Sequence, residues 1–412
     1  MNKDVPLALQ RGRALRQYPW MDGDIKTDVC VIGGGVTGVL CALRLIEAGR
    51  SVVLLSRSPV GYGATSRLMP CSLCDCGQEL RVLYRKMGRD SALRLLELTR
   101  DAADELEELC AQLSGTVGFA RRDCVVYASS DTEAERLRRD YTEYRRSGFA
   151  CIGMDRGAFA GAFAFPAAGA LMISGGAVEL DPYELTQHAA ARAWEAGAVI
   201  FENTSAERIS PMEKGGVKIY TSTHRQVTAG CAVIAAGAAC AELTGGIALG
   251  RTRYIAACPA AQGFRGWPGR CVVRSAGEPG IICSSSPDGR VYISSEASPA
   301  ADGRERLRGA LHMPSASEKR SKELEDAARY LFPETGIKKY DAGWSFRGLR
   351  TADGLPVVGS PQGQAGCLMA VSGGEGGVLL SALLSRMIAE ELCGRESRDM
   401  AMFSPTRRRL AG

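Results

Sequence analysis

Histidine and aromatic residues are scarce in this chain, and its positive and negative charges nearly balance. The 412 residues include three histidines and 6% aromatic residues, and 51 basic against 46 acidic side chains leave a formal net charge of +5. None of the histidines falls within a motif, so we interpret them as structural residues. The small excess of positive charge does not indicate a nucleic-acid partner.

The chain also lacks a long apolar run. No stretch reaches the roughly 20 residues that a membrane-spanning helix needs. The basic N-terminal region contains no continuous apolar segment of the kind found in secretory signal peptides. Cysteine is abundant, but the 15 residues are an odd number and cannot all pair within one chain. We therefore expect a cytoplasmic protein in a reducing compartment, with no membrane span.

A glycine-rich turn near the N-terminus joins a predicted strand to a predicted helix. The apolar strand TDVCVI covers residues 27–32, and residues 33–38 follow with the spacing G-x-G-x-x-G. Helical spacing then extends over residues 36–48, and a second apolar strand occupies residues 51–55. Because the glycines lie between a strand and a helix of one βαβ unit, the pattern predicts a dinucleotide-binding motif.

Each glycine of this motif has its own physical role. Gly33 permits the tight turn, Gly35 lets a pyrophosphate approach the backbone, and Gly38 allows the helix and the strand to pack closely. The helix begins at Val36 and Thr37, and the free N–H groups and partial positive charge of its first turn favour a phosphate. We therefore predict that these residues bind the cofactor.

The end of the second strand leaves the type of dinucleotide open. An acidic residue commonly stands there and binds the ribose hydroxyls, but this chain has Ser56 followed by Arg57. A serine hydroxyl also hydrogen-bonds a ribose, less strongly than a carboxylate does. Arg57 instead suits a 2′-phosphate, so an NADP-linked enzyme is an alternative.

Residues 29–67 resemble the opening of the D-amino-acid oxidase/glycine oxidase superfamily of FAD-dependent oxidoreductases. In that superfamily, the second strand is followed by a segment that lies along the cofactor, and here this segment reads GYGATSR. Further stretches resemble the superfamily in the same order along the chain, at residues 202–206, 231–239, 353–359, 372–381 and 403–405. The resemblance covers nearly the whole chain and implies FAD as the cofactor.

The resemblance assigns further residues to the FAD site. They are Gly63, Ala64, Thr65, Ser66, Ala206, Ala236, Gly237, Gly374, Glu375, Gly376 and Gly377. The last four stand directly before an apolar helix over residues 378–392, whose positive end would stabilise the negative charge that a flavin gains on reduction. Glu375 would oppose this effect, and the alternative is an ordinary glycine-rich loop that caps a helix.

The resemblance also implies the chemistry, which is oxidation of a C–N bond in an amine or amino acid by hydride transfer to the flavin. An amino-acid substrate needs a group that binds its carboxylate, and a bidentate arginine is suited to this. Arg350 and Arg347 lie in the segment that faces the substrate in the superfamily, and two further candidates, Arg253 and Tyr254, begin the region expected to form the substrate domain. Each arginine is equally compatible with a surface or ion-pair role.

The cysteines of Cys71-x-x-Cys74-x-Cys76 follow the flavin-proximal segment directly. A redox pair or a metal site is conceivable, but no histidine or cysteine pair nearby supplies a fourth metal ligand at the spacing typical of metal sites. We interpret these residues as ordinary thiols and predict no metal site.

We predict an α/β fold with a Rossmann-like FAD-binding domain, built on a parallel sheet, and an inserted α+β substrate domain with a mixed or antiparallel sheet. The FAD-binding domain is expected over residues 1–88, 165–250 and 340–412, and the substrate domain over residues 89–164 and 251–339. The expected partner is a small amine or amino acid, and a homo-oligomer is compatible with the sequence. The alternative function is a flavin-binding sensor or electron-transfer subunit without amine turnover.

Overall fold

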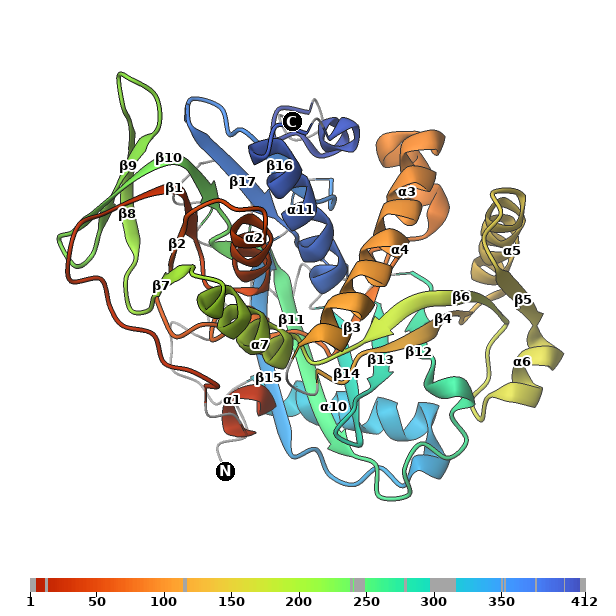
Figure 1. Ribbon diagram of the computed structural model, residues 1–412. Coiled ribbons are helices and arrows are strands. Elements are labelled where there is room, and N and C mark those ends of the chain that lie inside the picture. Colours follow the sequence, from red (N-terminus) through yellow and green to blue (C-terminus); the bar gives the residue numbers. More distant parts are fainter. Residues whose placement is uncertain are drawn as a thin grey trace.

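Two β-sheets with helices packed around them make up the molecule (Figure 1). The computed structural model describes residues 5–11, 14–113, 117–237, 240, 249–277, 280–296, 316–349, 351, 353–374, 376–395 and 397–407. Among these residues, no helix is both long and apolar enough to cross a membrane.

The first sheet has the strand order β16-β17-β10-β1-β2-β7. Its parallel strands are β1 (Ile25–Ile32), β2 (Val52–Leu55), β7 (Val199–Phe201), β10 (Gln226–Ile234) and β17 (Cys367–Val371). The antiparallel strand β16 (Val357–Gly359) forms one edge, and the hairpin of β8 (Ala206–Pro211) and β9 (Val217–Thr221) extends from β10. The last four residues of β1 and all of β2 are buried, as expected for strands covered on both faces.

Three helices lie side by side on this sheet (Figure 1). Helix α2 (Val36–Glu47) contacts both α7 (Pro182–Glu195) and α11 (Gly377–Leu392). Helix α7 begins at Pro182 because the Asp181 carboxylate caps it, accepting hydrogen bonds from the backbone N–H groups of Tyr183 and Glu184. These helices bury the parallel strands and leave the carboxyl ends of those strands facing the second sheet.

The second sheet has the order β15-β11-β14-β13-β12-β4-β6-β3, and β5 pairs with β6. Its strands are β3 (Cys71–Leu73), β4 (Ala120–Ala128), β5 (Cys151–Asp155), β6 (Gly169–Glu179), β11 (Leu249–Pro259), β12 (Val272–Ser275), β13 (Ile281–Ser285), β14 (Arg290–Glu296) and β15 (Ala342–Leu349). All neighbours pair antiparallel except β12 and β4. Helix α10 (Ala316–Leu331) packs on β11, β14 and β15.

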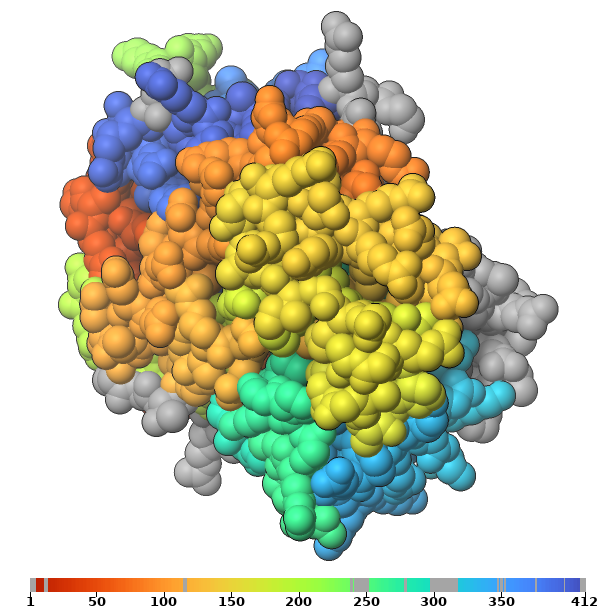
Figure 2. Space-filling view, turned by 90° about the vertical axis from the view of Figure 1, so that its right-hand side faces the viewer, coloured from red at the N-terminus to blue at the C-terminus, as the bar shows by residue number. Residues whose placement is uncertain are grey.

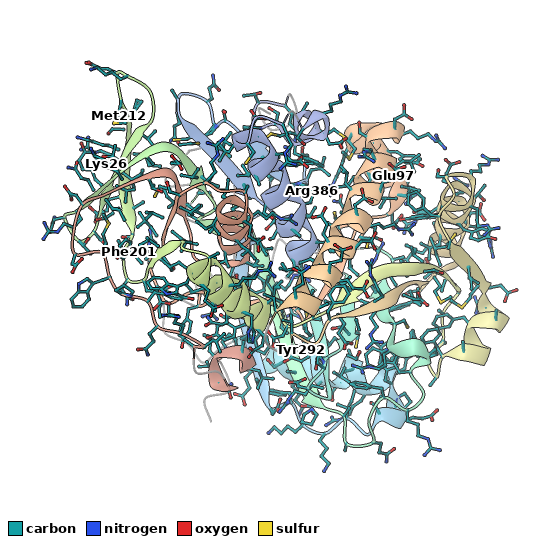
Figure 3. All side chains as sticks on the ribbon, in the orientation of Figure 1. Lys26, Glu97, Phe201, Met212, Tyr292 and Arg386 are labelled. Atoms are coloured by element: carbon teal, nitrogen blue, oxygen red, sulfur yellow. The ribbon has the colours of Figure 1, made fainter. Side chains whose placement is uncertain are left out.

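Helices α3 (Leu80–Met87) and α4 (Arg89–Gln112) connect β3 to β4 of the second sheet. Helix α4 contacts α11, and its Glu105 forms an ion pair with Arg386 of α11, which is labelled in Figure 3. Helices α5 (Asp131–Arg146) and α6 (Arg156–Ala162) lie beside β5 and β6, and Figure 2 shows this yellow region between orange residues, which precede it in the chain, and green and blue residues, which follow it.

The predicted fold class is confirmed, because a largely parallel Rossmann-like sheet is joined to a second, mixed sheet. The expected domain limits differ from the observed sheets at three strands. Strands β3, β6 and β15 belong to the second sheet, although their residues were expected in the FAD-binding part. Sheet membership depends on hydrogen bonds to partners distant in the chain, such as those between β6 and β4, and local apolar patterns do not report these bonds.

Candidate active site

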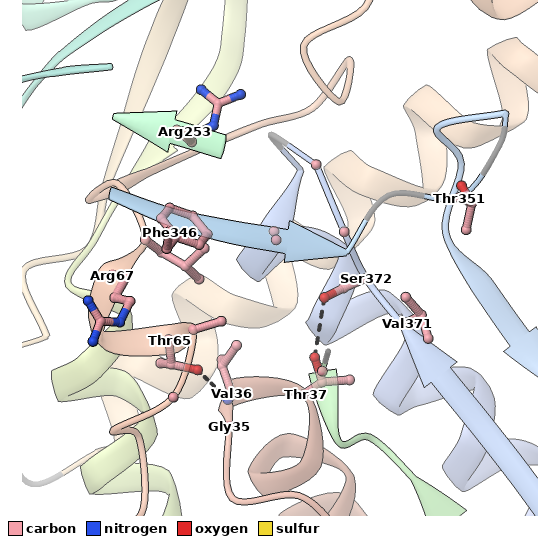
Figure 4. A pocket seen from close by; sticks show the side chains of 18 of the residues that line it. Gly35, Val36, Thr37, Thr65, Arg67, Arg253, Phe346, Thr351, Val371 and Ser372 are labelled. Carbon is pink, nitrogen blue, oxygen red and sulfur yellow. Dashed lines mark hydrogen bonds between the residues drawn. The ribbon is translucent and has the colours of Figure 1, made fainter. Parts of the chain in front are cut away.

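A cavity of about 910 Å³ lies at the carboxyl ends of the parallel strands. One wall consists of residues at or just after the ends of β1, β2, β10 and β17, and the other carries residues of β11, β12, β13 and β15. Figure 4 shows part of this cavity, with residues of both walls facing each other. Ligands of open α/β sheets bind at this position, outside the carboxyl ends of the strands.

The glycine motif forms the floor of the cavity. Gly33 has a φ of 126°, and a Cβ there would lie 2.3 Å from the Ala235 carbonyl oxygen. A Cβ on Gly38 would lie 1.9 Å from the Gly33 carbonyl oxygen, so this residue serves helix packing and does not line the cavity. Gly35 lines the cavity, and a Cβ there would meet only the Thr65 hydroxyl, at 3.2 Å. Gly33 and Gly38 are therefore required for close packing, whereas Gly35 leaves space for a ligand at the floor of the cavity.

The segment after β2 is attached to the start of α2. The backbone N–H of Val36 donates to the Thr65 hydroxyl oxygen at 3.0 Å, a contact drawn in Figure 4. Val36, Thr37, Gly63, Ala64 and Thr65 all line the cavity. Ser66 was expected at the cofactor, but its buried hydroxyl donates to the carbonyl oxygens of Tyr62 and Gly63 and stabilises the turn instead.

Ser56 and Arg57 line the cavity at the end of β2, as do Ala206, Ala236 and Gly237 nearby. The Ser56 hydroxyl donates to the carbonyl oxygen of Ser58 at 2.6 Å, which leaves its lone pairs as acceptors. A ribose hydroxyl can donate to these lone pairs, so the residue fits the role expected of it. Glu202, which was not assigned a role from the sequence, is buried and accepts hydrogen bonds from the N–H groups of Val60 and Tyr18.

The start of α11 differs from the sequence expectation. Gly374 and Gly377 line the cavity, but a Cβ on Gly376 would lie close to Leu380 and Cys76, so Gly376 is a packing residue. The N–H groups of Val378 and Leu379 donate to the Ser72 hydroxyl, at 3.1 and 3.3 Å. These donors are therefore occupied by the protein, and α11 acts on the cavity through its partial positive charge. Glu375 lies outside the described residues.

A hydroxyl cluster joins the two helix starts. The Thr37 hydroxyl lies 2.8 Å from that of Ser381 and 3.3 Å from that of Ser372, and the last two are 3.1 Å apart. Thr37 and Ser372 also line the cavity (Figure 4). The cluster fixes the starts of α2 and α11 relative to each other beneath the cavity.

The wall formed by the second sheet carries two arginines in ion pairs. Arg253 of β11 donates to Glu296 at 2.9 Å and to the Ser294 hydroxyl at 3.1 Å. Arg274 of β12 donates to Asp75 at 2.6 Å. Arg253 was a candidate from the sequence, whereas Arg274 was not, because its carboxylate partner lies 199 positions away in the chain.

The Asp75–Arg274 pair is almost fully buried, with 3% and 7% of the two side chains exposed. Burial lowers the pKa of Arg274, but the Asp75 carboxylate outweighs this effect and holds that pKa above its usual value, so the guanidinium stays charged. Asp75 also accepts from the N–H of Gly77 at 2.9 Å, which shapes the turn before α3. This turn brings Cys76 and Gln78 to the cavity wall.

The three closely spaced cysteines do not carry reactive thiolates. Burial raises the pKa of Cys71 and of Cys74 to about 12, and it raises the pKa of Cys76 further. These thiols are therefore protonated at neutral pH. Within the part of the chain that the structure describes, no group of three or more ligating side chains could hold a metal ion.

The structure places none of the side chains of Arg347, Arg350 and Tyr254, which were predicted to bind the substrate, in the cavity lining that it describes. Arg350 lies outside the described residues, and Arg347 is described only by its backbone, which pairs with Thr252. Tyr254 was a weaker candidate and lies in the hydrophobic core of the second domain with 3% of its surface exposed. It does not line the cavity, because its ring packs on the opposite side of β11 from Arg253.

These residues fit a bound dinucleotide. The open position at Gly35, the first turn of α2 and the acceptor oxygen of Ser56 follow one another along the cavity. The fold and this cavity together define a dinucleotide-binding α/β protein with a second, mixed sheet over the site.

The chain belongs to the FAD dependent oxidoreductase family (DAO), whose model matches residues 28–391. Among characterised proteins, it is 26% identical to glycine oxidase of Geobacillus kaustophilus over 400 residues, which cover 93% of this chain and 97% of that enzyme. The crystal structure of glycine oxidase from that organism superposes with a TM-score of 0.74 at 23% identity, over 93% of this chain and 99% of the other.

L-amino acid deaminase from Proteus myxofaciens shares the fold as well, with a TM-score of 0.75 at 14% identity over 96% of this chain and 97% of the other. The protein is therefore an FAD-dependent enzyme of this family, and the predicted cofactor is confirmed. The two alternatives, an NADP-linked enzyme and a flavin-binding protein without turnover, are not supported. Arg57 lines the FAD cavity.

Gly35→Ala should fold but bind FAD more weakly. The added methyl group meets the Thr65 hydroxyl at 3.2 Å, a contact that a small shift relieves, but it occupies the cavity floor where the pyrophosphate approaches. We expect the FAD dissociation constant to rise at least tenfold, as measured by fluorescence titration of the apoprotein. Gly161→Ala, which meets nothing within 4 Å, serves as the control. Equal affinity in both variants would remove Gly35 from the cofactor site.

Proposed function

We propose that this enzyme oxidises the C–N bond of an amino acid or a secondary amine. One observation supports the proposal most strongly. The glycine motif that fits a dinucleotide lies on one side of the cavity, and the second sheet, which carries arginines, lies on the other side. FAD, when bound, supplies the acceptor for a hydride and two electrons. Relatives with this fold include a glycine oxidase and an L-amino acid deaminase, whose names support an amino-acid substrate.

The protein's own contribution to this reaction is to orient the substrate and to keep water away from it. Phe346, Leu68 and Ile282 line the cavity and form apolar surface near the charged groups. Such apolar surface excludes water from the cavity. The charged side chains of the lining therefore interact with a ligand in a medium of low dielectric constant, where electrostatic interactions are stronger. Holding the reacting C–H bond in one orientation accounts for a large part of the rate in reactions of this type.

The cavity also fits the charge of an amino acid. Its lining includes Arg67, Arg253 and Arg274 as cations and Glu296 and Glu79 as anions. A carboxylate is bound most firmly by an arginine in a bidentate arrangement. Arg347 and Arg350, on or next to the strand that carries Phe346, remain predicted carboxylate-binding residues.

The expected result with the purified enzyme is a flavin absorption spectrum that bleaches when the correct substrate is added without oxygen. A panel of amino acids, N-methylated amino acids and simple amines would identify the substrate class. The matched control is the corresponding 2-hydroxy acid, which keeps the carboxylate but replaces the C–N bond. A flavin that is reduced by the hydroxy acid and by no nitrogen compound would overturn the proposal.

A further inference from the structure

We propose that the Ser372 hydroxyl donates a hydrogen bond to the flavin of bound FAD and raises its reduction potential, and that Ser381 is the positioning residue that polarises this hydroxyl. The inference concerns the cofactor alone. It does not depend on the substrate that the enzyme oxidises, so it holds or fails independently of the proposed function.

The backbone N–H groups in the first turn of α11 donate to acceptors of the protein itself. The N–H of Gly377 donates to the carbonyl oxygen of Gly374 at 3.3 Å, and those of Val378 and Leu379 donate to the Ser72 hydroxyl at 3.1 and 3.3 Å. Negative charge gathers on a flavin when it is reduced, and donors that point at this charge stabilise it. Because these three N–H groups are already engaged, a side-chain donor is needed at this end of the cavity.

Ser372 occupies the position from which such a donor can act. It follows β17 directly, at the carboxyl end of a parallel strand, and it lines the cavity (Figure 4). Its hydroxyl oxygen lies 3.1 Å from that of Ser381 and 3.3 Å from that of Thr37. The side chain is therefore held between the starts of α2 and α11 and remains in contact with the cavity.

The three hydroxyls of this cluster have one proton each. The proton of Ser381 has two acceptors, the carbonyl oxygen of Gly377 at 2.8 Å and the hydroxyl oxygen of Ser372 at 3.1 Å. Since this proton is engaged, the contact of 2.8 Å between Thr37 and Ser381 is made with the proton of Thr37. Within the cluster, the proton of Ser372 has only Thr37 as an acceptor, at 3.3 Å, which is long for a bond between hydroxyls. This proton is therefore available to a group in the cavity.

The order of donation, from Thr37 to Ser381 and from Ser381 to Ser372, strengthens the last donor. A hydroxyl that accepts a hydrogen bond is polarised and donates more strongly, and a low local dielectric constant enhances the effect. Thr37 is 9% exposed and Ser381 is fully buried, so the chain of hydroxyls runs through the protein interior beneath the cavity. A polarised donor, together with the partial positive charge of α11, favours the reduced flavin over the oxidised one.

The test measures the reduction potential of the bound flavin by anaerobic titration with dithionite in the presence of a reference dye. In Ser372→Ala, we expect the preference for reduced over oxidised flavin to fall about tenfold, which lowers the potential of a two-electron couple by about 30 mV. Ser381→Ala leaves Ser372 in place and should lower the potential in the same direction by a smaller amount. The visible absorption spectrum before titration should show an unchanged FAD content in both variants.

Ser385→Ala is the matched control. Ser385 lies one turn after Ser381 in α11, is equally buried and likewise donates to a helix carbonyl oxygen, that of Ala382 at 2.8 Å, but its hydroxyl accepts from Arg44 instead of Thr37. A Ser372→Ala enzyme with the wild-type potential would overturn the inference. A shift in Ser381→Ala no larger than that in Ser385→Ala would overturn the positioning role. Loss of FAD from either cluster variant would also count against it, because the hydroxyls would then retain the cofactor without setting its potential.

Discussion

Gly38→Ala should yield a protein that retains almost no FAD and unfolds at a lower denaturant concentration than the wild type. The new Cβ would lie 1.9 Å from the carbonyl oxygen of Gly33, which is backbone and cannot rotate away. Gly33 in turn lies against Ala235 of the neighbouring segment, so the turn cannot retreat. Helix α2 must therefore move off the sheet, and overpacking of this kind costs about 1–3 kcal/mol or more.

Urea unfolding of the apoprotein, together with the flavin-to-protein ratio after purification, measures both parts of this expectation. Gly161→Ala is the matched control, because it adds the same methyl group in α6 where nothing lies within 4 Å. A Gly38→Ala protein with the stability and flavin content of this control would show that the close contact between α2 and the glycine turn is not required.

Asp75→Asn should destabilise the protein by about 3–5 kcal/mol, because it leaves the buried guanidinium of Arg274 without its counter-charge. Both side chains are almost completely shielded from water, and Nη2 of Arg274 lies 2.6 Å from Oδ2 of Asp75. Asparagine keeps an acceptor for the N–H of Gly77, so the loss is electrostatic. Because Arg274 lines the cavity, we also expect weaker binding of substrate.

The double variant Asp75→Asn, Arg274→Met shows whether Asp75→Asn destabilises the protein through the unpaired charge of Arg274 or through a general loss of packing. Removal of both charges should restore a large part of the stability that the single change removes. Asp104→Asn is the surface control, since Asp104 pairs with Arg121 but its side chain is 70% exposed, and such pairs contribute roughly 0–1 kcal/mol. Equal effects of Asp75→Asn and Asp104→Asn in urea unfolding would contradict the importance of the buried pair.

The parts of the fold that follow local rules could be predicted from the sequence. The glycines of the dinucleotide motif and the strand and helix around them appear at the expected residues, because each depends on neighbours within about 30 positions. Helix α7 begins at Pro182 and ends at Glu195, and residues next to it in the sequence mark both ends, the capping Asp181 and the terminal Gly197. The cofactor, FAD, could also be predicted, because the sequence resembles a known superfamily of FAD-dependent oxidoreductases.

The substrate wall could not be predicted, because its contacts join distant segments. Asp75 and Arg274 meet only when β12 lies across from the turn before α3. Asp75 stands between Cys74 and Cys76, and nothing in the local sequence indicates a partner in β12. The positive start of α11 was expected near the flavin, but the hydroxyl of Ser72, more than 300 positions away, accepts hydrogen bonds from two of its N–H groups. Strand β6 was likewise missed, since its pairing with β4 decides its place.

The cavity draws its lining from four separate stretches of the chain, which lie within residues 32–86, 205–237, 253–296 and 345–377. FAD therefore finds its complete site only on a chain that has already folded throughout, and it binds the folded state without binding the unfolded one. At a free FAD concentration a hundred times the dissociation constant, such a ligand adds about 2.7 kcal/mol to stability. The abundance of this enzyme in a cell should accordingly follow the supply of flavin, since chains left without it spend more time unfolded and exposed to proteases.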